Sequence, residues 1–376
     1  MTAWAIAAGD FTPLGGMDRA NHALARYLAG SGRDVHLVAH RVWQDLASMP
    51  NVTVHHAARP LGSRLLGGPL LARTAASTAT RLPAGSRLLS NGGNTRWTAP
   101  TWIHYLHAAY EPHSVDVRAR IVATAGRRGY LAHEADAIAR ARTVICNSRR
   151  TAADVSRAYT VGEQAIRVVY YGTDPQQFGA ISGDERRAAR ASLGLDADRP
   201  VALFVGALGD RRKGFDILFE AWRTLCADAA WDVDLAVAGG GAEAGEWARR
   251  ADAQGLERRI RFLEFRDDIP RVLAGADAMV HPVRYEAYGL GVHEALCRGL
   301  PAIVSSCAGV AERLPAALAP LMLTDPESPA ELVERLRLWR GDINGWRERA
   351  NIFGAELRRR TWDDMAAEIA RIVEHS

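Results

Sequence analysis

The chain has 376 residues, of which 48% are hydrophobic and 24% charged, and its formal net charge is +4. This length predicts two domains, and the composition is that of a folded protein and excludes a disordered one. No apolar run reaches about 18 residues, and no charged segment precedes a short apolar one. We therefore expect neither a membrane-spanning helix nor a secretory signal, and we expect a cytoplasmic protein. The four cysteines (Cys146, Cys226, Cys297 and Cys307) form no Cys-x-x-Cys pair, which predicts reduced thiols without a metal site.

Short apolar runs alternate with amphipathic patterns along almost the whole chain. In the first half, the runs predict strands at residues 4–8, 34–39, 52–56, 87–90, 102–107, 143–147 and 167–171. The patterns between them predict helices at about 16–30, 63–76, 117–141 and 149–158. In the second half, strands are predicted at 201–205, 234–238, 260–263, 278–281, 302–305 and 321–323, with helices between them.

This regular alternation predicts an α/β fold with two parallel sheets in succession, each covered by helices. The segment 172–200 is polar and contains two prolines and several aspartates, so we interpret it as a hinge. We divide the chain into residues 1–173, 174–357 and 358–376. The last segment is a helix that we expect to cross back to the first domain.

The two halves differ in charge. Residues 1–170 contain 20 arginines and 10 acidic residues, whereas the remainder contains 27 basic and 33 acidic residues. This asymmetry predicts that the first half meets an anionic partner. No nucleic-acid motif occurs, so we expect no nucleic acid but a phosphorylated substrate or an anionic membrane surface. Segment 61–83 combines Leu65, Leu66, Leu70 and Leu71 with Arg64, Arg73 and Arg81, so it is a basic amphipathic element that can lie on a membrane or form an ordinary face of the domain.

Lys213 is the only lysine in the chain, which otherwise uses arginine for every positive charge. It follows the apolar run 201–208, within the sequence Arg211-Arg212-Lys213-Gly214. A flexible stem with a compact ammonium group can reach a phosphate where a planar guanidinium group would not fit. The isolated lysine therefore indicates a phosphate contact.

A second group of candidate residues follows the strand predicted at 278–281. A loop carries Glu286, Gly289 and Gly291 leave the backbone bare where a helix begins, and Glu294 lies one to two turns into that helix. The start of a helix offers unpaired N–H groups and a positive dipole to an anion. Two carboxylates beside such a start are poor phosphate ligands but suit the hydroxyl groups of a ribose and a sugar.

Glu286-x7-Glu294 in this glycine-rich frame, with Arg-Lys213-Gly upstream, resembles the retaining glycosyltransferases of family 4 (glycosyl transferases group 1). The resemblance extends over the whole chain, through Gly15-Gly16, His107, Asn147-Ser148, the stretch 169–178 and Trp362-Asp-Asp. It implies the GT-B fold, in which two Rossmann-like domains face each other across a cleft, with the nucleotide sugar bound by the second domain.

The resemblance also implies roles for particular residues. His107, Lys213 and Glu286 would be catalytic, and Gly15 and Gly16 would form a loop for the acceptor or a phosphate. The residues implied in donor binding are Arg212, Lys213, Glu286, Gly289, Leu290, Gly291 and Glu294. Within the last set, Lys213 would contact the diphosphate, Glu294 the ribose and Glu286 the sugar.

One position departs from the family pattern. The family often has an arginine six residues before the lysine, where this chain has Ala207, so Arg211 or Arg212 is the candidate replacement for that charge.

The reaction implied is a front-face displacement that retains the anomeric configuration. The leaving diphosphate would help to deprotonate the acceptor hydroxyl, and His107 would position the sugar. The expected partners are a nucleotide sugar (UDP- or GDP-linked) as co-substrate and a glycan or lipid-linked glycan as acceptor, in polysaccharide or glycolipid biosynthesis. We expect no cofactor and no metal. The alternatives are a nucleotide-sugar epimerase and a non-catalytic nucleotide-sugar-binding protein of the same architecture.

Other motifs carry less weight. Asp232-Val-Asp234 has the form of a metal-binding Asp-x-Asp, but it begins a strand of the second domain. Gly239-Gly240-Gly241 lacks the spacing of a dinucleotide fingerprint, and we interpret it as a turn beside the donor base. We interpret His104 and His113 as structural or surface residues.

Overall fold

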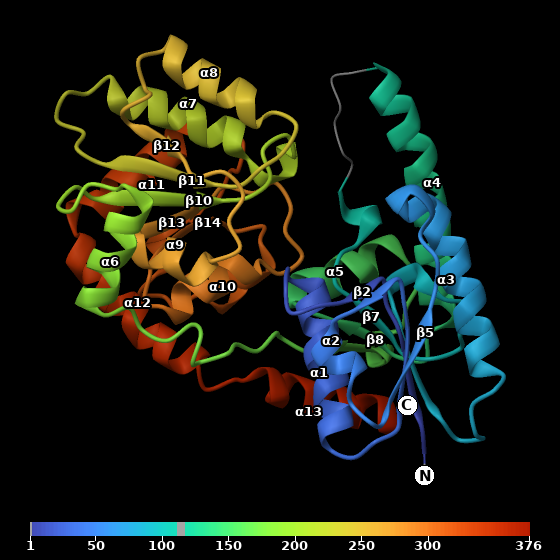
Figure 1. Ribbon diagram of the computed structural model, residues 1–376. Coiled ribbons are helices and arrows are strands. Elements are labelled where there is room, and N and C mark those ends of the chain that lie inside the picture. The colour runs from blue at the N-terminus through green and yellow to red at the C-terminus, as the bar shows by residue number, and fades with distance from the viewer. Residues whose placement is uncertain (1, 111–116) are drawn as a thin grey trace. The chain divides into compact units, whose positions relative to one another are not determined.

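The computed structural model describes residues 2–110 and 117–376, which form two compact units. Unit 1 consists of residues 1–172 and 361–376, and unit 2 consists of residues 173–360. Figure 1 shows that each unit is an α/β structure built around a central sheet. The division falls next to the predicted boundaries, at Gly172 and Thr173 and again at Arg360 and Thr361.

The sheet of unit 1 has seven strands in the order β5-β3-β1-β6-β7-β8-β9, and every neighbouring pair is parallel. Its strands are β1 (Trp4–Ala7), β3 (Val35–Ala39), β5 (Val52–His56), β6 (Arg87–Asn91), β7 (Thr101–Ile103), β8 (Val144–Cys146) and β9 (Ile166–Val168). The central strand β1 pairs Ile6 with Leu37 on one side and with Leu89 on the other. Such buried aliphatic runs are typical of a parallel sheet covered on both faces.

Helices cover both faces of this sheet. The longer helices of unit 1 are α1 (Met17–Gly30), α3 (Arg64–Ala79), α4 (Val117–Arg140), α5 (Arg149–Ala158) and α13 (Trp362–Glu374). The connections β1-α1-β3 and β5-α3-β6 run in opposite directions along the sheet. Right-handed crossovers therefore place α1 and α3 on opposite faces. A short helix α2 (Gln44–Ala47) and a two-stranded sheet of β2 (Asp10–Phe11) and β4 (Arg41–Val42) complete the regular structure near α1.

The last helix, α13, belongs to unit 1 although it follows the whole of unit 2 in the sequence. It packs against α1, as Figure 1 shows, and buries an apolar stripe that includes Met365, Ile369 and Val373. Its first turn is fixed by a capping box, in which Thr361 and Asp364 each bond the other's backbone N–H group. The expectation of a terminal helix on the first domain therefore corresponds to an observed packing of α13 on α1.

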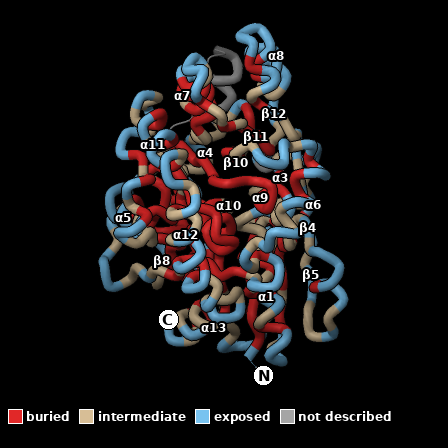
Figure 2. The backbone as a smooth tube through the Cα atoms, turned by 90° about the vertical axis from the view of Figure 1, so that its left-hand side faces the viewer, coloured by how far each residue is buried: buried red, intermediate tan, exposed pale blue. Residues whose placement is uncertain are grey.

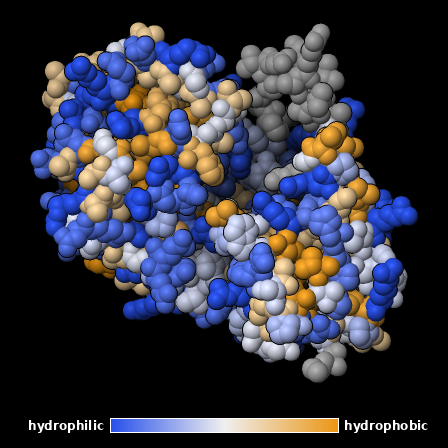
Figure 3. Space-filling model, viewed as in Figure 1, coloured by the Kyte–Doolittle hydropathy of each residue, from blue (hydrophilic) through white to orange (hydrophobic). Residues whose placement is uncertain are grey.

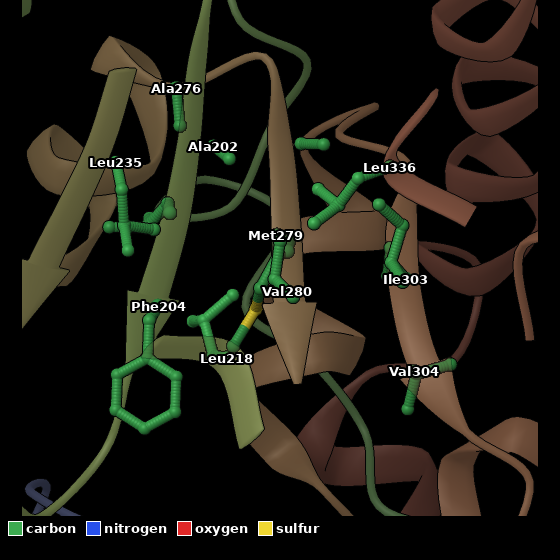
Figure 4. Close-up of a cluster of buried hydrophobic side chains, with 14 of the residues drawn as sticks. Ala202, Phe204, Leu218, Leu235, Ala276, Met279, Val280, Ile303, Val304 and Leu336 are labelled. Atoms are coloured by element: carbon green, nitrogen blue, oxygen red, sulfur yellow. The ribbon is translucent and has the colours of Figure 1, made fainter. Parts of the chain in front are cut away.

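Unit 2 has a six-stranded parallel sheet in the order β12-β11-β10-β13-β14-β15. Its strands are β10 (Val201–Val205), β11 (Asp234–Ala238), β12 (Ile260–Phe262), β13 (Ala278–His281), β14 (Ala302–Ser305) and β15 (Met322–Leu323). The core between sheet and helices is aliphatic and aromatic, and Figure 4 shows Phe204, Leu218 and Met279 lying close together within it. This core holds β10 and β13 rigidly side by side, and their ends carry the candidate residues.

The helices of unit 2 are α6 (Gly183–Leu193), α7 (Phe215–Cys226), α8 (Ala244–Ala253), α9 (Ile269–Gly275), α10 (Leu290–Cys297), α11 (Pro329–Gly341) and α12 (Ile343–Leu357). Among them α7 packs on α11, α6 on α9 and α10 on α12. Figure 2 shows that α10 is buried along most of its length, and residues Val292–Cys297 are all buried. Because α10 is so enclosed, the position of its N-terminus at Gly289 and Leu290 is fixed within unit 2.

Each predicted strand range overlaps an observed strand, and the α/β class with two parallel sheets is confirmed. The interpretation of residues 172–200 as a hinge is wrong for its middle part, because these residues include α6. This helix begins at Ser182, whose side chain accepts a bond from the backbone of Glu185, and ends at the left-handed Gly194. It packs on α9 and is therefore part of unit 2.

Candidate functional site

Lys213 and Glu286 form a direct ion pair in unit 2. The Nζ atom of Lys213 lies 2.6 Å from Oε2 of Glu286, and the two side chains are 18% and 16% exposed. Lys213 ends a short 3₁₀ helix, η5 (Arg211–Lys213), after β10, and Glu286 lies in the loop after β13. Because β10 and β13 are neighbours in the sheet, their carboxyl-end loops meet at one edge. The topology thus joins two residues that are 73 positions apart.

Gly214 allows these two loops to approach each other. Its φ of +70° is left-handed, and a Cβ atom at this position would lie 1.9 Å from the carbonyl oxygen of Pro282. Beside it the backbone N–H of Arg284 donates to the carbonyl oxygen of Arg212 at 2.9 Å. The glycine and this hydrogen bond hold the Lys213 turn against the Glu286 loop.

The ion pair determines the charge of Glu286. Burial is the largest single influence and would by itself raise the pKa of this carboxyl, but the positive charge of Lys213, together with His281 and Arg212, outweighs burial and holds the pKa well below its usual range. His281 lies beside it, with Nε2 3.6 Å from Oε2 of Glu286. Burial is the largest cause that lowers the pKa of His281, and Lys213 adds to it. Neither ring nitrogen of His281 has a hydrogen-bond partner within residues 2–110 and 117–376.

The start of α10 lies next to Glu286. Gly289, its N-cap, has a φ of +104° and offers no capping side chain, and a Cβ there would come within 3.4 Å of Glu286 Cγ. Leu290 and Gly291 form the first turn, where backbone N–H groups are available to a ligand. A Cβ at Gly291 would make only an ordinary contact with Met279, so packing does not require glycine there. Glu294 is 5% exposed within the helix.

The arginines before Lys213 are held by neighbouring carboxylates. Nε and Nη2 of Arg212 lie 3.2 and 3.0 Å from Oδ2 of Asp210, and Nη2 of Arg211 lies 3.5 Å from Asp216. Asp216 also receives two bonds of 2.8 Å from Arg284. The structure therefore places Arg212 in the same turn as Lys213 but engages its guanidinium group with Asp210.

His107 lies in unit 1, in a short 3₁₀ helix η3 (His107–Ala109) after β7. Its side chain is 40% exposed, and its Nδ1 lies 3.0 Å from Oε2 of Glu134 on α4. Tyr130 stacks on the ring with a centroid distance of 5.0 Å, and Tyr105 meets it edge-on at the same distance. The ring is thus fixed both in its plane and through one nitrogen.

The glycine pair of unit 1 lies between β2 and α1. Gly15 has a φ of +77° with open space around its Cβ position, whereas Gly16 is the N-cap of α1 in an ordinary helical conformation. Asp10 lies just before this loop and is 7% exposed. Its Oδ2 is 3.4 Å from Arg41 and 3.5 Å from Arg59. Its Oδ1 has no hydrogen-bond partner in the described part of the chain.

Three members of these sites were not recognised from the sequence, namely Glu134, Asp10 and His281. Glu134 could have been found, because it shares a helical face with the buried residues Ala137 and Ile138, three and four positions later. An acid on the apolar face of a helix needs buried donors. Of the other histidines, His104 is buried and bonded to the hydroxyl of Tyr171, whereas His113 lies outside the described residues.

The Asp-x-Asp triplet is engaged by arginines, as Asp232 bonds Arg340 at 2.7 Å and Asp234 bonds Arg259 at 3.1 Å. Among the described residues, no group of three or more His, Cys, Asp or Glu side chains is arranged to hold a metal ion. In the same part of the chain, no helix combines the length and the apolar character needed to cross a bilayer.

Comparison with known proteins gives matches in both units. Residues 14–177 match the family described as Glycosyltransferase Family 4, and residues 199–339 match Glycosyl transferases group 1. D-inositol 3-phosphate glycosyltransferase of Mycobacterium sp. (strain KMS) is 33% identical over 184 residues, which cover 47% of this chain and 40% of that protein. The matched segment spans less than half the length of this relative.

Solved structures are similar over nearly the whole chain. WaaG, a glycosyltransferase involved in lipopolysaccharide biosynthesis, gives a TM-score of 0.77 at 18% identity, covering 98% of this chain and 99% of that one. Anabaena HepE in complex with UDP-glucose gives a TM-score of 0.75 at 19% identity, covering 100% of both chains. These two show the GT-B fold, and the two matched families account for most of the sequence. The chain belongs to the group 1, family 4 glycosyltransferases.

Proposed function

We propose that this protein is a metal-independent, retaining glycosyltransferase that moves a hexosyl unit from a UDP- or GDP-sugar to a hydroxyl group of an acceptor. The observation that carries the proposal is the Lys213–Glu286 pair, in which a compact cation and a carboxylate lie 2.6 Å apart at the carboxyl edge of the unit 2 sheet. Ligands of open α/β sheets bind at this edge.

The pair suits a nucleotide sugar, which carries both a diphosphate and hydroxyl groups. On donor binding, Lys213 would exchange its contact with Glu286 for a phosphate oxygen, and Glu286 would accept a bond from a sugar hydroxyl. The uncapped start of α10 would add backbone N–H groups to the same diphosphate. Negative charge grows on the leaving diphosphate as the sugar departs, so these donors stabilise the transition state more than the ground state.

His107 would position the transferring sugar, and Glu294 the ribose, as the family resemblance implies. The reaction needs no cofactor, because the nucleotide sugar is a co-substrate. Two features support independence from metal. Lys213 and Arg212 lie in the turn that is proposed to bind the diphosphate, where they would take the part of a divalent ion, and both carboxylates of the Asp-x-Asp triplet are paired with arginines.

The acceptor proposed is a glycan or lipid-linked glycan intermediate of polysaccharide or glycolipid biosynthesis, met by unit 1 at an anionic membrane surface. Leu61 is 97% exposed, and Leu65, Leu66 and Leu70 are also exposed along α3. Figure 3 shows apolar side chains at the surface where α3 begins. An arginine-rich helix with exposed leucines is suited to the boundary between headgroups and acyl chains.

Unit 1 also exposes arginines on α3, after it and on α4. Arg73 and Arg81 are exposed on and after α3, and Arg128 is exposed on α4. The side chains of Arg64, Arg118 and Arg120 lie outside the described residues.

Incubation with a panel of labelled nucleotide sugars and a membrane lipid extract tests the proposal. We expect release of a nucleoside diphosphate that depends on the acceptor, with the anomeric configuration of the sugar preserved in the product. Isomerisation of the donor without acceptor would instead identify an epimerase, and binding without either reaction would identify a non-catalytic protein. Turnover should persist in excess chelator, and loss of turnover that Mn²⁺ or Mg²⁺ restores would contradict the metal-independent mechanism.

A further inference from the structure

Glu134 is a buried carboxylate whose two oxygens are surrounded by hydrogen-bond donors. Its side chain is 4% exposed. Oε2 lies 2.7 Å from the backbone nitrogen of His107 and 3.0 Å from Nδ1 of the same residue. Oε1 accepts from the backbone N–H of Ala108 at 3.2 Å and from the hydroxyl of Tyr159 at 2.7 Å. One side chain in the middle of α4 thus binds both the backbone and the ring of His107.

The chemistry of these partners fixes the direction of each bond. Two are backbone N–H groups and can only donate. Burial, the bond to Glu134 and the charge of Glu134 all raise the pKa of Tyr159, so its hydroxyl keeps the proton and donates it. An ionised carboxylate only accepts. The bond between Glu134 and His107 therefore requires the proton on Nδ1.

We infer that Glu134 is a positioning residue that fixes the tautomer and the orientation of His107. With Nδ1 protonated and bonded, the acceptor lone pair of the neutral ring lies on Nε2, at the opposite edge of the ring. His107 then offers Nε2 as a hydrogen-bond acceptor to a hydroxyl group of the substrate. This inference rests on the proposed function for its catalytic consequence but not for the tautomer itself.

The surroundings of His107 explain why a carboxylate is needed. Glutamine at position 134 would keep one acceptor oxygen, but its amide NH₂ would face two of the donors now bonded to the carboxylate. Stacking on Tyr130, with an angle of 14° between the rings, holds the plane of the imidazole but cannot choose which nitrogen carries the proton. Among the contacts of the described residues, the bond to Oε2 makes that choice.

A merely structural role is the competing explanation, since Glu134 also bonds the two backbone N–H groups at the start of η3. The two explanations differ in what they predict for the ring. A structural role would leave the tautomer of His107 unchanged in a variant that still folds. A positioning role requires that the tautomer and the turnover change together.

The test uses the full chain with ¹⁵N-labelled histidine, at a pH well above the ordinary histidine pKa. A His107→Gln variant assigns the ring signals of His107 by their disappearance from ¹H–¹⁵N spectra. In the wild type we expect a protonated Nδ1 and an unprotonated Nε2. In Glu134→Gln we expect a mixture of both tautomers, and a pure, unchanged tautomer would overturn the inference.

Turnover supplies a second readout. We expect Glu134→Gln to lower kcat by about 10- to 100-fold, the scale seen when a histidine loses the partner that orients it, with little change in donor KM. Adding Glu134→Gln to His107→Gln should lower kcat no further, because Glu134 acts through the ring. A further loss in the double variant would assign Glu134 to a structural role.

Two further variants keep the experiment decisive. Asp136→Asn changes an acid on the same helix whose partner is Arg140, at 2.8 Å, and should leave both the tautomer and turnover unchanged. If Glu134→Gln does not fold, Glu134→Asp keeps the charge but withdraws the oxygens and should show the same mixture of tautomers. If no donor is turned over even by the wild type, the proposed function fails, while the spectra still decide whether Glu134 sets the tautomer.

Discussion

In unit 2, Lys213 and Glu286 are brought together by the turns that follow two strands, whereas His107 of unit 1 is held by a side chain of helix α4. Lys213 and Glu286 approach each other from the ends of two adjacent strands and neutralise each other directly. His107 instead depends on Glu134, which enters from α4 and has no role in forming the sheet. Under the proposed function, a phosphate group of the donor would replace Glu286 as the partner of Lys213. In unit 1, the bond from Nδ1 of His107 to Glu134 leaves Nε2 as the nitrogen that would accept a hydrogen bond from the substrate.

The largest expected effect is the loss of turnover on breaking the Lys213–Glu286 pair. Lys213→Ala should lower kcat/KM by about 100-fold or more, the scale of losing one strong electrostatic stabiliser. Lys213→Arg should not restore it, because a planar guanidinium group replaces a compact ammonium group. Steady-state assays with the best donor of the panel provide the measurement, and full activity of Lys213→Ala would remove the phosphate role of Lys213.

A double variant separates this catalytic loss from a loss of stability. Lys213→Ala leaves the carboxylate of Glu286 largely buried without its cation, which destabilises the fold. Lys213→Ala combined with Glu286→Gln removes both charges, so we expect the melting temperature to recover in part while turnover stays low.

The same difference explains why the candidate residues of unit 2 were easier to recognise from the sequence than Glu134 of unit 1. The strands were predictable because apolar runs of three to six residues are separated by helical patterns and turns. Lys213 and Glu286 could be chosen as candidates because each follows an apolar strand pattern in a segment that contains glycines, but their ion pair was not predicted. The position of Glu134 on the apolar face of α4 marked it as a residue that needs donors, but its pairing with His107 could not be predicted, because that partner is 27 positions away and the bond depends on how α4 packs against η3.

Residues 172–200 were wrongly interpreted as a hinge for a related reason, because a long-range contact hides the apolar face of α6. The buried face of α6 includes Arg190, which is 5% exposed because its Nη2 lies 2.6 Å from Oδ2 of the buried Asp277. A buried arginine makes an amphipathic helix look polar throughout. Ser182 and Gly194, which begin and end the helix, were signals that could have revealed it.

The second prediction asks whether the two units lose stability alike in acid. Each has a buried histidine bonded to a tyrosine hydroxyl, His104 to Tyr171 in unit 1 and His293 to Tyr288 in unit 2. Burial lowers the pKa of each to about 3, and for His293 the charges of Arg313 and Arg360 contribute. Below the ordinary pKa of about 6.5, the unfolded chain therefore binds protons that the folded chain does not.

Stability should accordingly be complete above about pH 6.5 and fall as the pH is lowered toward 3, by up to about 1.4 kcal/mol per pH unit for each histidine. Urea unfolding at a series of pH values measures this slope. His104→Gln and His293→Gln should each flatten it, and the variant with the smaller slope identifies the unit that limits stability in acid. An unchanged slope in both variants would assign acid unfolding to other groups.

The third prediction compares the glycines next to the two candidate sites. Gly214→Ala combines a left-handed φ of +70° with a Cβ 1.9 Å from a carbonyl oxygen, whereas Gly15→Ala has a similar φ of +77° but open space. The left-handed conformation alone costs about 1–2 kcal/mol. We expect this cost for Gly15→Ala and a larger loss of unfolding free energy for Gly214→Ala, together with lower donor affinity. Equal costs would mean that the Lys213 turn can move away from Pro282.

The smallest expected effect is on binding of unit 1 to membranes, through the arginines and exposed leucines of α3. Each arginine near an anionic leaflet contributes about 1 kcal/mol, so several are needed for reversible binding. We expect sedimentation with phosphatidylserine or phosphatidylglycerol vesicles, weaker binding to neutral vesicles, and loss of binding at high salt.

Two pairs of variants locate this binding on the chain. Arg73→Glu and Arg81→Glu should weaken it, because they replace positive by negative charge on and just after α3, the helix that carries the exposed leucines. Arg249→Glu and Arg258→Glu, on exposed positions of unit 2, make the same change of charge and should leave it intact. Equal effects of the two pairs would mean that net charge alone drives the binding. Absence of binding, or equal binding to both kinds of vesicle at every salt concentration, would leave a soluble acceptor as the substrate of unit 1, because the excess of arginine would then not direct the protein to an anionic membrane.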